Sequence, residues 1–285
     1  MSLRNRWRKF LNVFMLAMTG VCAVAAVSIL FLILGYLAWN GWRSLDWNFF
    51  TRLPKPPGEL GGGMANAIVG SAQIVLLATL IGAPVGFFGG VYLSEFGGRG
   101  FSFVVRYVAD LLNGVPSIVI GILAWTVVVV PLHRFSALAG ALALGLMLIP
   151  ITMRQTEQFL RDVPQSMREG ALALGASKWK MIATVVVPAA MRGIATGMIL
   201  GVARIAGETA PLLFTSLNNQ FWSSGWNQPT ASLPVMIFSH AIAPYEDWHR
   251  QAWAAGLVLL LLVLLANVAA RFILSRGISA QRGYL

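Results

Sequence analysis

Six long apolar segments constrain this chain more than any other feature of its sequence. Each approaches or exceeds the roughly 20 residues that an α-helix needs to cross the hydrocarbon core of a bilayer. Only 11% of the residues are charged and 57% are hydrophobic, whereas soluble globular proteins carry about 25% charged residues. The sequence therefore predicts an all-α membrane protein with six transmembrane helices and no sizeable soluble core. The predicted spans are residues 12–38, 66–93, 106–131, 136–153, 189–215 and 252–274.

The start of the chain resembles a secretory signal, because the basic segment 1–11 precedes an apolar run. That run continues through Trp39, well beyond the ~7–15 residues of a signal-peptide core. We therefore expect an uncleaved first span.

The distribution of basic residues predicts the orientation in the membrane. A net charge of +11 could indicate nucleic-acid binding, but the Lys and Arg side chains gather in alternate connecting segments. Cytoplasmic connections are rich in Lys and Arg, which places the N-terminal segment 1–11, the loop at about 154–188 and the C-terminal tail 275–285 in the cytoplasm. We expect no nucleic-acid partner. The basic residues left outside are Arg43, Arg52, Lys55, Arg134 and Arg250.

The loop between the fourth and fifth spans reads as two helices separated by a break. Gly175 stands where a helix C-terminus favours a left-handed residue, and Ser177 can cap the second helix. Pro188 then marks the entry to the next apolar run. A paired-helix loop at a membrane surface is expected to dock onto another protein rather than to span the bilayer.

The predicted fifth span carries charged residues at membrane depth. At about 100° per residue, Gly193, Gly197, Gly201, Arg204, Glu208 and Pro211 share one narrow stripe of a helix. The glycines permit close helix contact, and an arginine near the bilayer centre costs at least about 2.5–3.5 kcal/mol unless it faces protein or water. Two interpretations stay open: Arg204 and Glu208 form a structural ion pair, or Arg204 binds an oxyanion while Glu208 neutralises it between turnovers.

Catalytic and metal-binding patterns are not found in the sequence. The Gly170-to-Gly175 spacing imitates the start of a P-loop, but Ala176 occupies the lysine position and no strand precedes it. The histidines His133, His240 and His249 are scattered, without a metal-site spacing. We expect no enzymatic activity, no metal and no cofactor bound by this chain.

The same loop resembles the "EAA" loop of bacterial ABC importer permeases. Glu169, Ala171, Gly175 and Pro188 match its spacing, although Gly170 replaces the usual first alanine. The resemblance implies a type I ABC importer transmembrane domain over residues 12–274. It also implies that these four residues belong to a coupling loop that inserts into a cytoplasmic ATPase dimer, which holds ATP and Mg.

Asn113 and Ser117 flank Pro116 near the start of the third span. Polar groups and a proline there predict a break that lines a cavity, or else a helix end capped by its own side chains, so both residues are lining candidates.

A second resemblance lies in the fifth span, where residues 203–215 and 218–222 are similar to the PstA family of phosphate-transport permeases. This PstA resemblance implies that Arg154, Arg204 and Glu208 line the phosphate path, with Thr209 as a further candidate. It also implies a second, related permease subunit, a periplasmic phosphate-binding protein, and location in the bacterial inner membrane. The external segment 216–251, with a short helix at 233–242, is expected either to meet that binding protein or to be an ordinary capping loop.

The sequence therefore predicts a permease subunit for ATP-driven uptake of inorganic phosphate. Sulfate or molybdate remains an alternative substrate. An ATP-independent secondary transporter would be expected to show repeated halves and leaves the coupling loop unexplained, while a membrane sensor leaves Arg204 unexplained.

Overall fold

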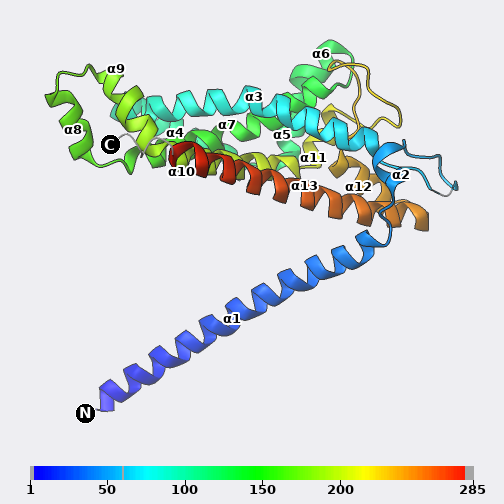
Figure 1. Cartoon of the computed structure of the whole chain (residues 1–285), viewed down its shortest axis with the longest axis horizontal. Helices are drawn as coiled ribbons and strands as arrows, with labels where there is room; N and C mark the ends of the chain where they lie inside the picture. Colours follow the sequence, from blue (N-terminus) through cyan, green and yellow to red (C-terminus); the bar gives the residue numbers. More distant parts are fainter. Residues whose placement is uncertain (1–2, 60, 280–285) are drawn as a thin grey trace.

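The computed structural model describes residues 3–59 and 61–279, and within these residues every regular element is a helix. Figure 1 shows a long bundle with the short helices α8 and α9 at one end, and α2, α6, α11 and α12 toward the other. The all-α prediction is confirmed. The long helices are α1 (Leu3–Trp42), α3 (Ala65–Glu95), α7 (Ala137–Arg161), α10 (Val187–Ala206) and α13 (Glu246–Ser279).

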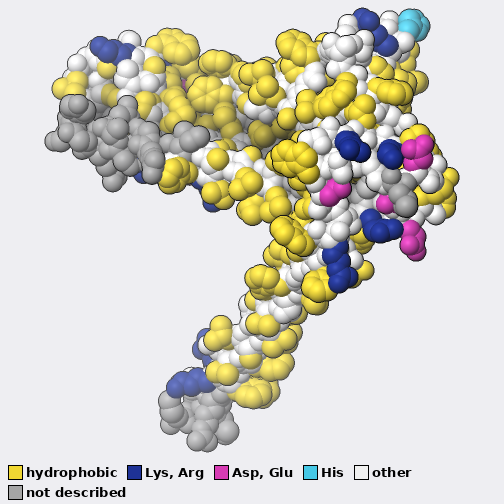
Figure 2. Space-filling view, turned by 45° about the vertical axis from the view of Figure 1, so that its right-hand side comes forward, with side chains coloured by type: hydrophobic (Ala, Val, Ile, Leu, Met, Phe, Trp, Pro, Cys, Tyr) yellow, Lys and Arg dark blue, Asp and Glu magenta, His cyan; other side chains and the backbone are white. Residues whose placement is uncertain are grey.

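Most of helix α1 projects away from the bundle, and its C-terminal end contacts α13 (Figure 1). There Gly41 approaches Leu257 so closely that an added Cβ would lie 2.8 Å from the leucine Cβ. The most apolar part of α1 is not buried inside the chain. In Figure 2, hydrophobic side chains cover α1 and the middle of the visible face, whereas charged side chains gather mainly near the ends. This distribution is typical of helices whose surroundings are lipid or another membrane protein.

The core of the bundle is the contact between α3 and α7. A Cβ on Gly82 would lie 2.7 Å from the Gly145 carbonyl oxygen, and one on Gly86 would lie 2.6 Å from the Thr152 Cβ. The two backbones therefore approach at a distance that only glycine allows.

The predicted third span is broken in the middle. Helix α4 (Arg99–Gly114) ends before Val115, and Pro116 caps the start of α5 (Ser117–Ala124). The segments before and after this break differ in direction by 103°. The sequence predicted a break at this proline, and the structure confirms it. A π-helical turn (Trp125–Val129) and α6 (Val130–Leu132) complete the second segment.

The predicted boundaries of the fifth span, 189–215, are wrong. Helical structure begins at Lys178 with α9 (Lys178–Met181) and passes through a π-helical turn (Ile182–Val186) into α10, which ends at Ala206. Pro188 therefore lies within a continuous helical segment, where the widened turn before it relieves the clash that its ring would cause. After Gly207 the chain starts a separate short helix, α11 (Ala210–Thr215).

Five helices are long and apolar enough to cross a membrane, or six if the bent pair around Pro116 counts as one span. The fourth span extends to Arg161, two turns beyond its predicted end. Helix α13 continues into the predicted tail 275–285, whose residues 280–285 lie outside the described part. The short helix expected at 233–242 is present as α12 (Leu233–Ala241). The remaining elements are α2 (Trp47–Thr51) and α8 (Gln165–Ala173).

Candidate functional site

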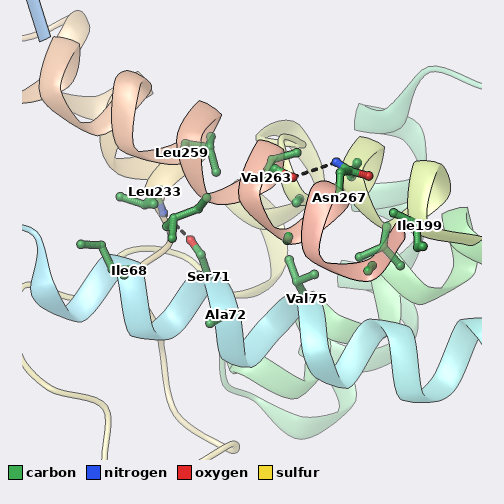
Figure 3. Close-up of a pocket in the computed structure, with 15 residues that line it drawn as sticks. Ile68, Ser71, Ala72, Val75, Ile199, Leu233, Leu259, Val263 and Asn267 are labelled. Atoms are coloured by element: carbon green, nitrogen blue, oxygen red, sulfur yellow. Dashed lines mark hydrogen bonds between the residues drawn. The ribbon is translucent and has the colours of Figure 1, made fainter. Parts of the chain in front are cut away.

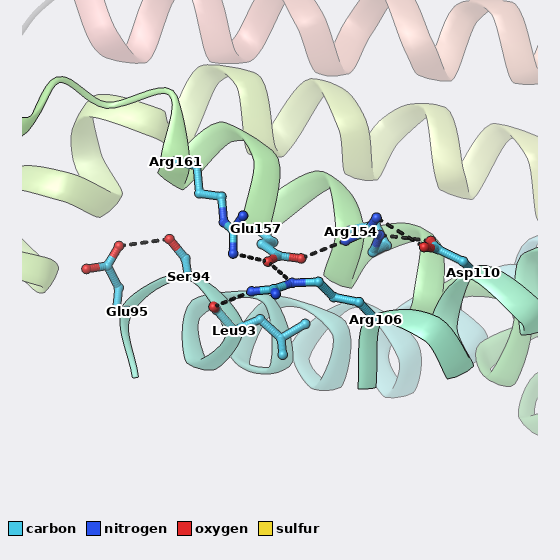
Figure 4. Close-up of polar contacts among 8 residues, drawn as sticks. All are labelled: Leu93, Ser94, Glu95, Arg106, Asp110, Arg154, Glu157 and Arg161. Carbon is cyan, nitrogen blue, oxygen red and sulfur yellow. Dashed lines mark hydrogen bonds and ion pairs between the residues drawn. The ribbon is translucent and has the colours of Figure 1, made fainter. Parts of the chain in front are cut away.

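The most charged part of the bundle is centred on Glu157 of α7, which is only 2% exposed. Its Oε1 accepts a hydrogen bond from Arg106 Nε at 2.6 Å and lies 2.8 Å from Arg161 Nη2. Its Oε2 accepts from Arg154 Nη1 at 2.9 Å. Figure 4 shows the three guanidinium groups converging on this single carboxylate. Charge-assisted contacts of this length are the strong kind.

Two helices supply this cluster, which we call the Glu157 cluster: Arg106, Asp110, Arg154, Glu157 and Arg161. On α7, Arg154 and Arg161 lie three residues before and four residues after Glu157, spacings that place them on one helix face. Helix α4 adds Arg106 and Asp110, and Asp110 Oδ1 lies 2.9 Å from Arg154 Nε. With three arginines and two carboxylates, the cluster keeps one positive charge in excess, so it favours a nearby anion.

Arg154 was the only member of the Glu157 cluster that the sequence predicted as a pathway residue. Glu157 and its contact with Arg106 were missed, because the two residues are 51 positions apart in the chain. One signal was available: an Arg–Glu–Arg pattern at three- and four-residue spacing directly after an apolar run.

Arg204 lies in the last turn of α10 and its side chain is exposed. The carbonyl ends of a helix favour a cation at that position. Within the described residues, the side chains of Arg204 and Glu208 form neither an ion pair nor a hydrogen bond, so the predicted Arg204–Glu208 pair is not formed. The reason is that α10 ends at Ala206, so Glu208 and Pro211 lie outside this helix and not on the predicted stripe.

The glycine stripe of α10 packs against α7 of the same chain. An added Cβ on Gly197 would lie 2.9 Å from the Gln155 Cβ, and one on Gly201 would lie 3.0 Å from Leu148 Cδ1. Gly197 is therefore level with Gln155, the neighbour of Arg154, whereas Arg204 lies seven residues further along α10. At about 1.5 Å per residue, the structure separates Arg204 from the level of Arg154 by ~10 Å along the bundle.

The remaining lining candidates lie at the two helix breaks. Ser117 is the first residue of α5, Thr209 immediately precedes α11, and both are half-buried. Asn113 is exposed in the last turn of α4. Helices α5 and α11 pack together, with Gly121 directly against Pro211. Ser117 and Thr209 are therefore each within about one helical turn, ~5.4 Å, of the same contact.

The predicted coupling loop has the expected local geometry. Gly175 follows α8 with φ of +81°, a left-handed conformation that glycine adopts without strain. The Ser177 side chain accepts the N–H of Lys180 and so caps α9. At the tip of the loop, Leu174 is 91% exposed and Trp179 is 68% exposed. The helix–break–helix prediction is confirmed.

A cavity of about 440 Å³ lies between α3, α10 and α13. Its lining is almost entirely aliphatic, with Ser71 and Asn267 as polar exceptions (Figure 3). The Ser71 hydroxyl already accepts the Leu233 N–H at 2.7 Å, and the Asn267 amide donates to the Val263 carbonyl. A phosphate anion would find no cation among these residues, so this cavity does not suit it. In the described part of the chain, no three His, Cys, Asp or Glu side chains are grouped so that they could hold a metal ion.

Comparisons with known proteins identify the family. Residues 82–278 match the model of the binding-protein-dependent transport system inner membrane component. The phosphate transport system permease protein PstA of Yersinia pestis is 43% identical over 274 residues, which cover 96% of this chain and 93% of that protein. This chain belongs to the PstA family. The PstA of Xylella fastidiosa strain Temecula1 is 47% identical over 240 residues, covering 84% of this chain and 83% of that protein.

More distant solved structures agree with the fold of this PstA-family chain. A bacterial alginate ABC transporter, in complex with a periplasmic protein bound to an alginate pentasaccharide, matches with a TM-score of 0.66 at 14% identity; the match covers 95% of this chain and 97% of that one. The MetNI methionine ABC transporter in an inward-facing conformation matches with a TM-score of 0.58 at 16% identity, over 75% of this chain and 96% of that one. These likenesses confirm that the fold is an ABC importer transmembrane domain.

Proposed function

We propose that this chain is one of two permease subunits of an ABC importer that carries inorganic phosphate inward across the bacterial inner membrane. The observation that carries the proposal is the likeness to PstA proteins, which extends over 96% of the chain. Residues 12–274 then form one transmembrane domain, and the segment 1–11, the coupling loop and the tail 275–285 face the cytoplasm. The chain itself performs no chemical catalysis and binds no cofactor.

The exposed tip of the coupling loop supports a separate ATPase as partner. Leu174 and Trp179 present apolar surface at the end of the bundle where α8 and α9 project (Figure 1). Exposed apolar patches on a charged surface are typical of protein interaction sites. In this proposal Glu169, Ala171, Gly175 and Pro188 shape the loop that docks on an ATPase dimer, which holds ATP and Mg. A second permease and a periplasmic phosphate-binding protein complete the complex.

Two arginines at different depths along the bundle, Arg204 and Arg154, support an anion path. Phosphate at neutral pH is a mono- to dianion, and it leaves water at a large cost unless charge-assisted donors replace its hydration shell. Arg204 has a guanidinium without an ion-pair partner among the described residues, beside the break that holds Glu208 and Thr209. Arg154 lies about 10 Å nearer the coupling loop, in the Glu157 cluster with its excess positive charge. We propose that the anion passes from the level of Arg204 and the breaks at Asn113, Ser117 and Thr209 to the level of Arg154.

Reconstitution of the complex tests this function. The two permeases and their ATPase are reconstituted into proteoliposomes with the ATPase facing a lumen that contains ATP. The binding protein and radiolabelled phosphate are then added outside. We expect accumulation that requires hydrolysable ATP and is not competed by excess sulfate or molybdate. Accumulation of sulfate or molybdate in preference to phosphate would support the alternative oxyanions. Accumulation without ATP hydrolysis would indicate a secondary transporter.

A further inference from the structure

Glu95, the last residue of α3, is a buried carboxylate outside the proposed anion path. Its side chain is 4% exposed. Both of its carboxylate oxygens accept from Arg168 Nη1, at 2.7 and 2.6 Å, and Oε1 also accepts from the Ser94 hydroxyl at 2.9 Å. A buried and fully paired carboxylate at a helix end holds its partner in one place, because either charge left alone there would be costly.

The partners of Glu95 come from both helices of the coupling loop. Arg168 belongs to α8, and its Nη2 also donates to the Leu160 carbonyl of α7 at 2.6 Å. Lys178 belongs to α9, and its Nζ donates to the Glu95 backbone carbonyl at 2.6 Å. The adjacent Phe96 ring supports the same helix, because Lys178 Nζ lies 4.6 Å from its centroid and the Trp179 ring lies 5.3 Å from it.

Helix α8 has little else to hold it, because none of its residues is buried. Helix α9 is anchored more firmly, since it continues through the π-helical turn into α10 and Met181 is buried. Packing therefore contributes little to the orientation of α8, and the contact of Arg168 with Glu95 makes up much of its attachment to α3. We call Glu95, Phe96, Arg168 and Lys178 the α3 clamp.

The α3 clamp and the Glu157 cluster share the same turns of α3 and α7. Arg106 of the cluster donates to the Leu93 carbonyl at 3.2 Å, two residues before Glu95. Arg168 of the clamp reaches the carbonyl of Leu160, three residues after Glu157. Figure 4 shows Leu93, Ser94 and Glu95 on one side of the Glu157 cluster. A displacement of α8 is thus transmitted to these turns through short charged contacts.

We propose that Glu95 is a positioning residue for energy coupling: it fixes both coupling helices to α3 and α7, so that movement of the ATPase displaces the Glu157 cluster. This inference rests on the proposed function, because it assumes an ATPase on α8 and α9. It assigns Glu95 and Arg168 a role in transmission and gives them no contact with the transported anion.

Uptake per ATP hydrolysed is the quantity that tests the clamp. In Glu95→Gln the carboxylate charge is lost while the side-chain shape stays. Losing this charged contact loosens α8 from α3, so we expect phosphate uptake per ATP to fall below the wild-type ratio, while the ATPase still co-purifies and hydrolyses ATP. Glu59→Gln is the matched control, because Glu59 pairs with Lys55 at an exposed site, 3.7 Å apart, and should leave the ratio unchanged.

Arg168→Lys provides a second variant that keeps the charge. A lysine amine can approach Glu95 but lacks the planar fork that also reaches the Leu160 carbonyl, so we expect an intermediate ratio. An unchanged ratio in both variants would overturn the proposal. A parallel fall of uptake and ATP hydrolysis, with the ratio preserved, would also overturn it, since that result describes a merely less active complex.

A distance measurement separates failure of the clamp from failure of the proposed function. Spin labels are placed at Ala173→Cys in α8 and Val69→Cys in α3, in a Cys22→Ser background. They should lie more than about 39 Å apart, because α3 alone spans that length from Val69 to Glu95 and α8 projects beyond its end (Figure 1). We expect one narrow distance distribution with Glu95 present and a broad one in Glu95→Gln, whichever solute the complex carries. A wild-type complex that transports no phosphate would contradict the proposed function, while equally narrow distributions in both proteins would contradict the clamp.

Discussion

Replacing Glu157 by glutamine should destabilise the permease and reduce phosphate uptake. Glu157 accepts from or pairs with three guanidinium groups at 2.6, 2.9 and 2.8 Å, and a neutral amide can satisfy at most part of this set. Breaking a buried ion pair by removing one partner costs about 3–5 kcal/mol. The arginine side chains are 26%, 37% and 53% exposed, so water recovers part of that cost, and we expect about 2–3 kcal/mol.

Thermal unfolding of the purified complex measures this loss. For chains of 150–250 residues, 1 kcal/mol corresponds to about 2–4 °C in Tm, and larger units shift less. For Glu157→Gln in this 285-residue chain we therefore expect a fall in Tm of at most about 12 °C. Phosphate uptake in the same membranes should fall as well, because Arg154 loses its orientation. Glu59→Gln serves as the control. A Tm and an uptake rate that both equal the wild-type values would refute the view that Glu157 holds the cluster together.

Three further variants test separate parts of the structure. Gly175→Val places a β-branched residue at φ +81°, which costs roughly 1–2 kcal/mol or more. The ATPase should then co-purify weakly or hydrolyse ATP without transport, while the chain still inserts into the membrane. Normal transport would contradict this geometry. Gly197→Leu should lower Tm, because overpacking α10 against Gln155 costs about 1–3 kcal/mol of stability. The control Gly20→Leu should leave Tm unchanged, because no atom lies within 4 Å of a Cβ added there. Equal Tm values in the two variants would contradict the α10–α7 contact. Burial lowers the pKa of His240 below its ordinary 6.5, although the nearby Asp247 opposes this shift. The unfolded chain therefore binds the proton more readily, and stability is lost as the pH falls through about 6.5. In His240→Gln the fall in Tm between about pH 7.5 and 5 should be smaller, and an unchanged slope of Tm against pH would refute this.

Features that depend on local chemistry could be predicted from the sequence. The length of an apolar run is sufficient to identify a span, and a glycine at a helix end is sufficient to place the left-handed residue at Gly175. The break before Ser117 followed in the same way from Pro116, because proline disfavours helical geometry at the residue before it.

Features that depend on distant partners could not be predicted. Gly207 follows three glycines of the same predicted span, and the sequence did not distinguish a glycine that ends the helix from the glycines of the packing stripe. Glu208 was therefore wrongly placed on the helix. Periodicity gave the face that carries Gly197, but not its neighbour, which is α7 of this chain. The contact between Glu157 and Arg106 exists only after α4 has packed on α7.

Uptake measured beside assembly in Arg204→Gln membranes tests the central claim most directly. Arg204 supplies an exposed guanidinium with no ion-pair partner among the described residues, and a phosphate anion that leaves water needs such a donor. We predict that Arg204→Gln abolishes ATP-driven phosphate uptake while both permeases and the ATPase still co-purify, and that Arg204→Lys restores little, because a point charge lacks the bidentate fork. Full uptake in the glutamine variant would contradict the anion path, and loss of assembly together with uptake would assign Arg204 a structural role instead.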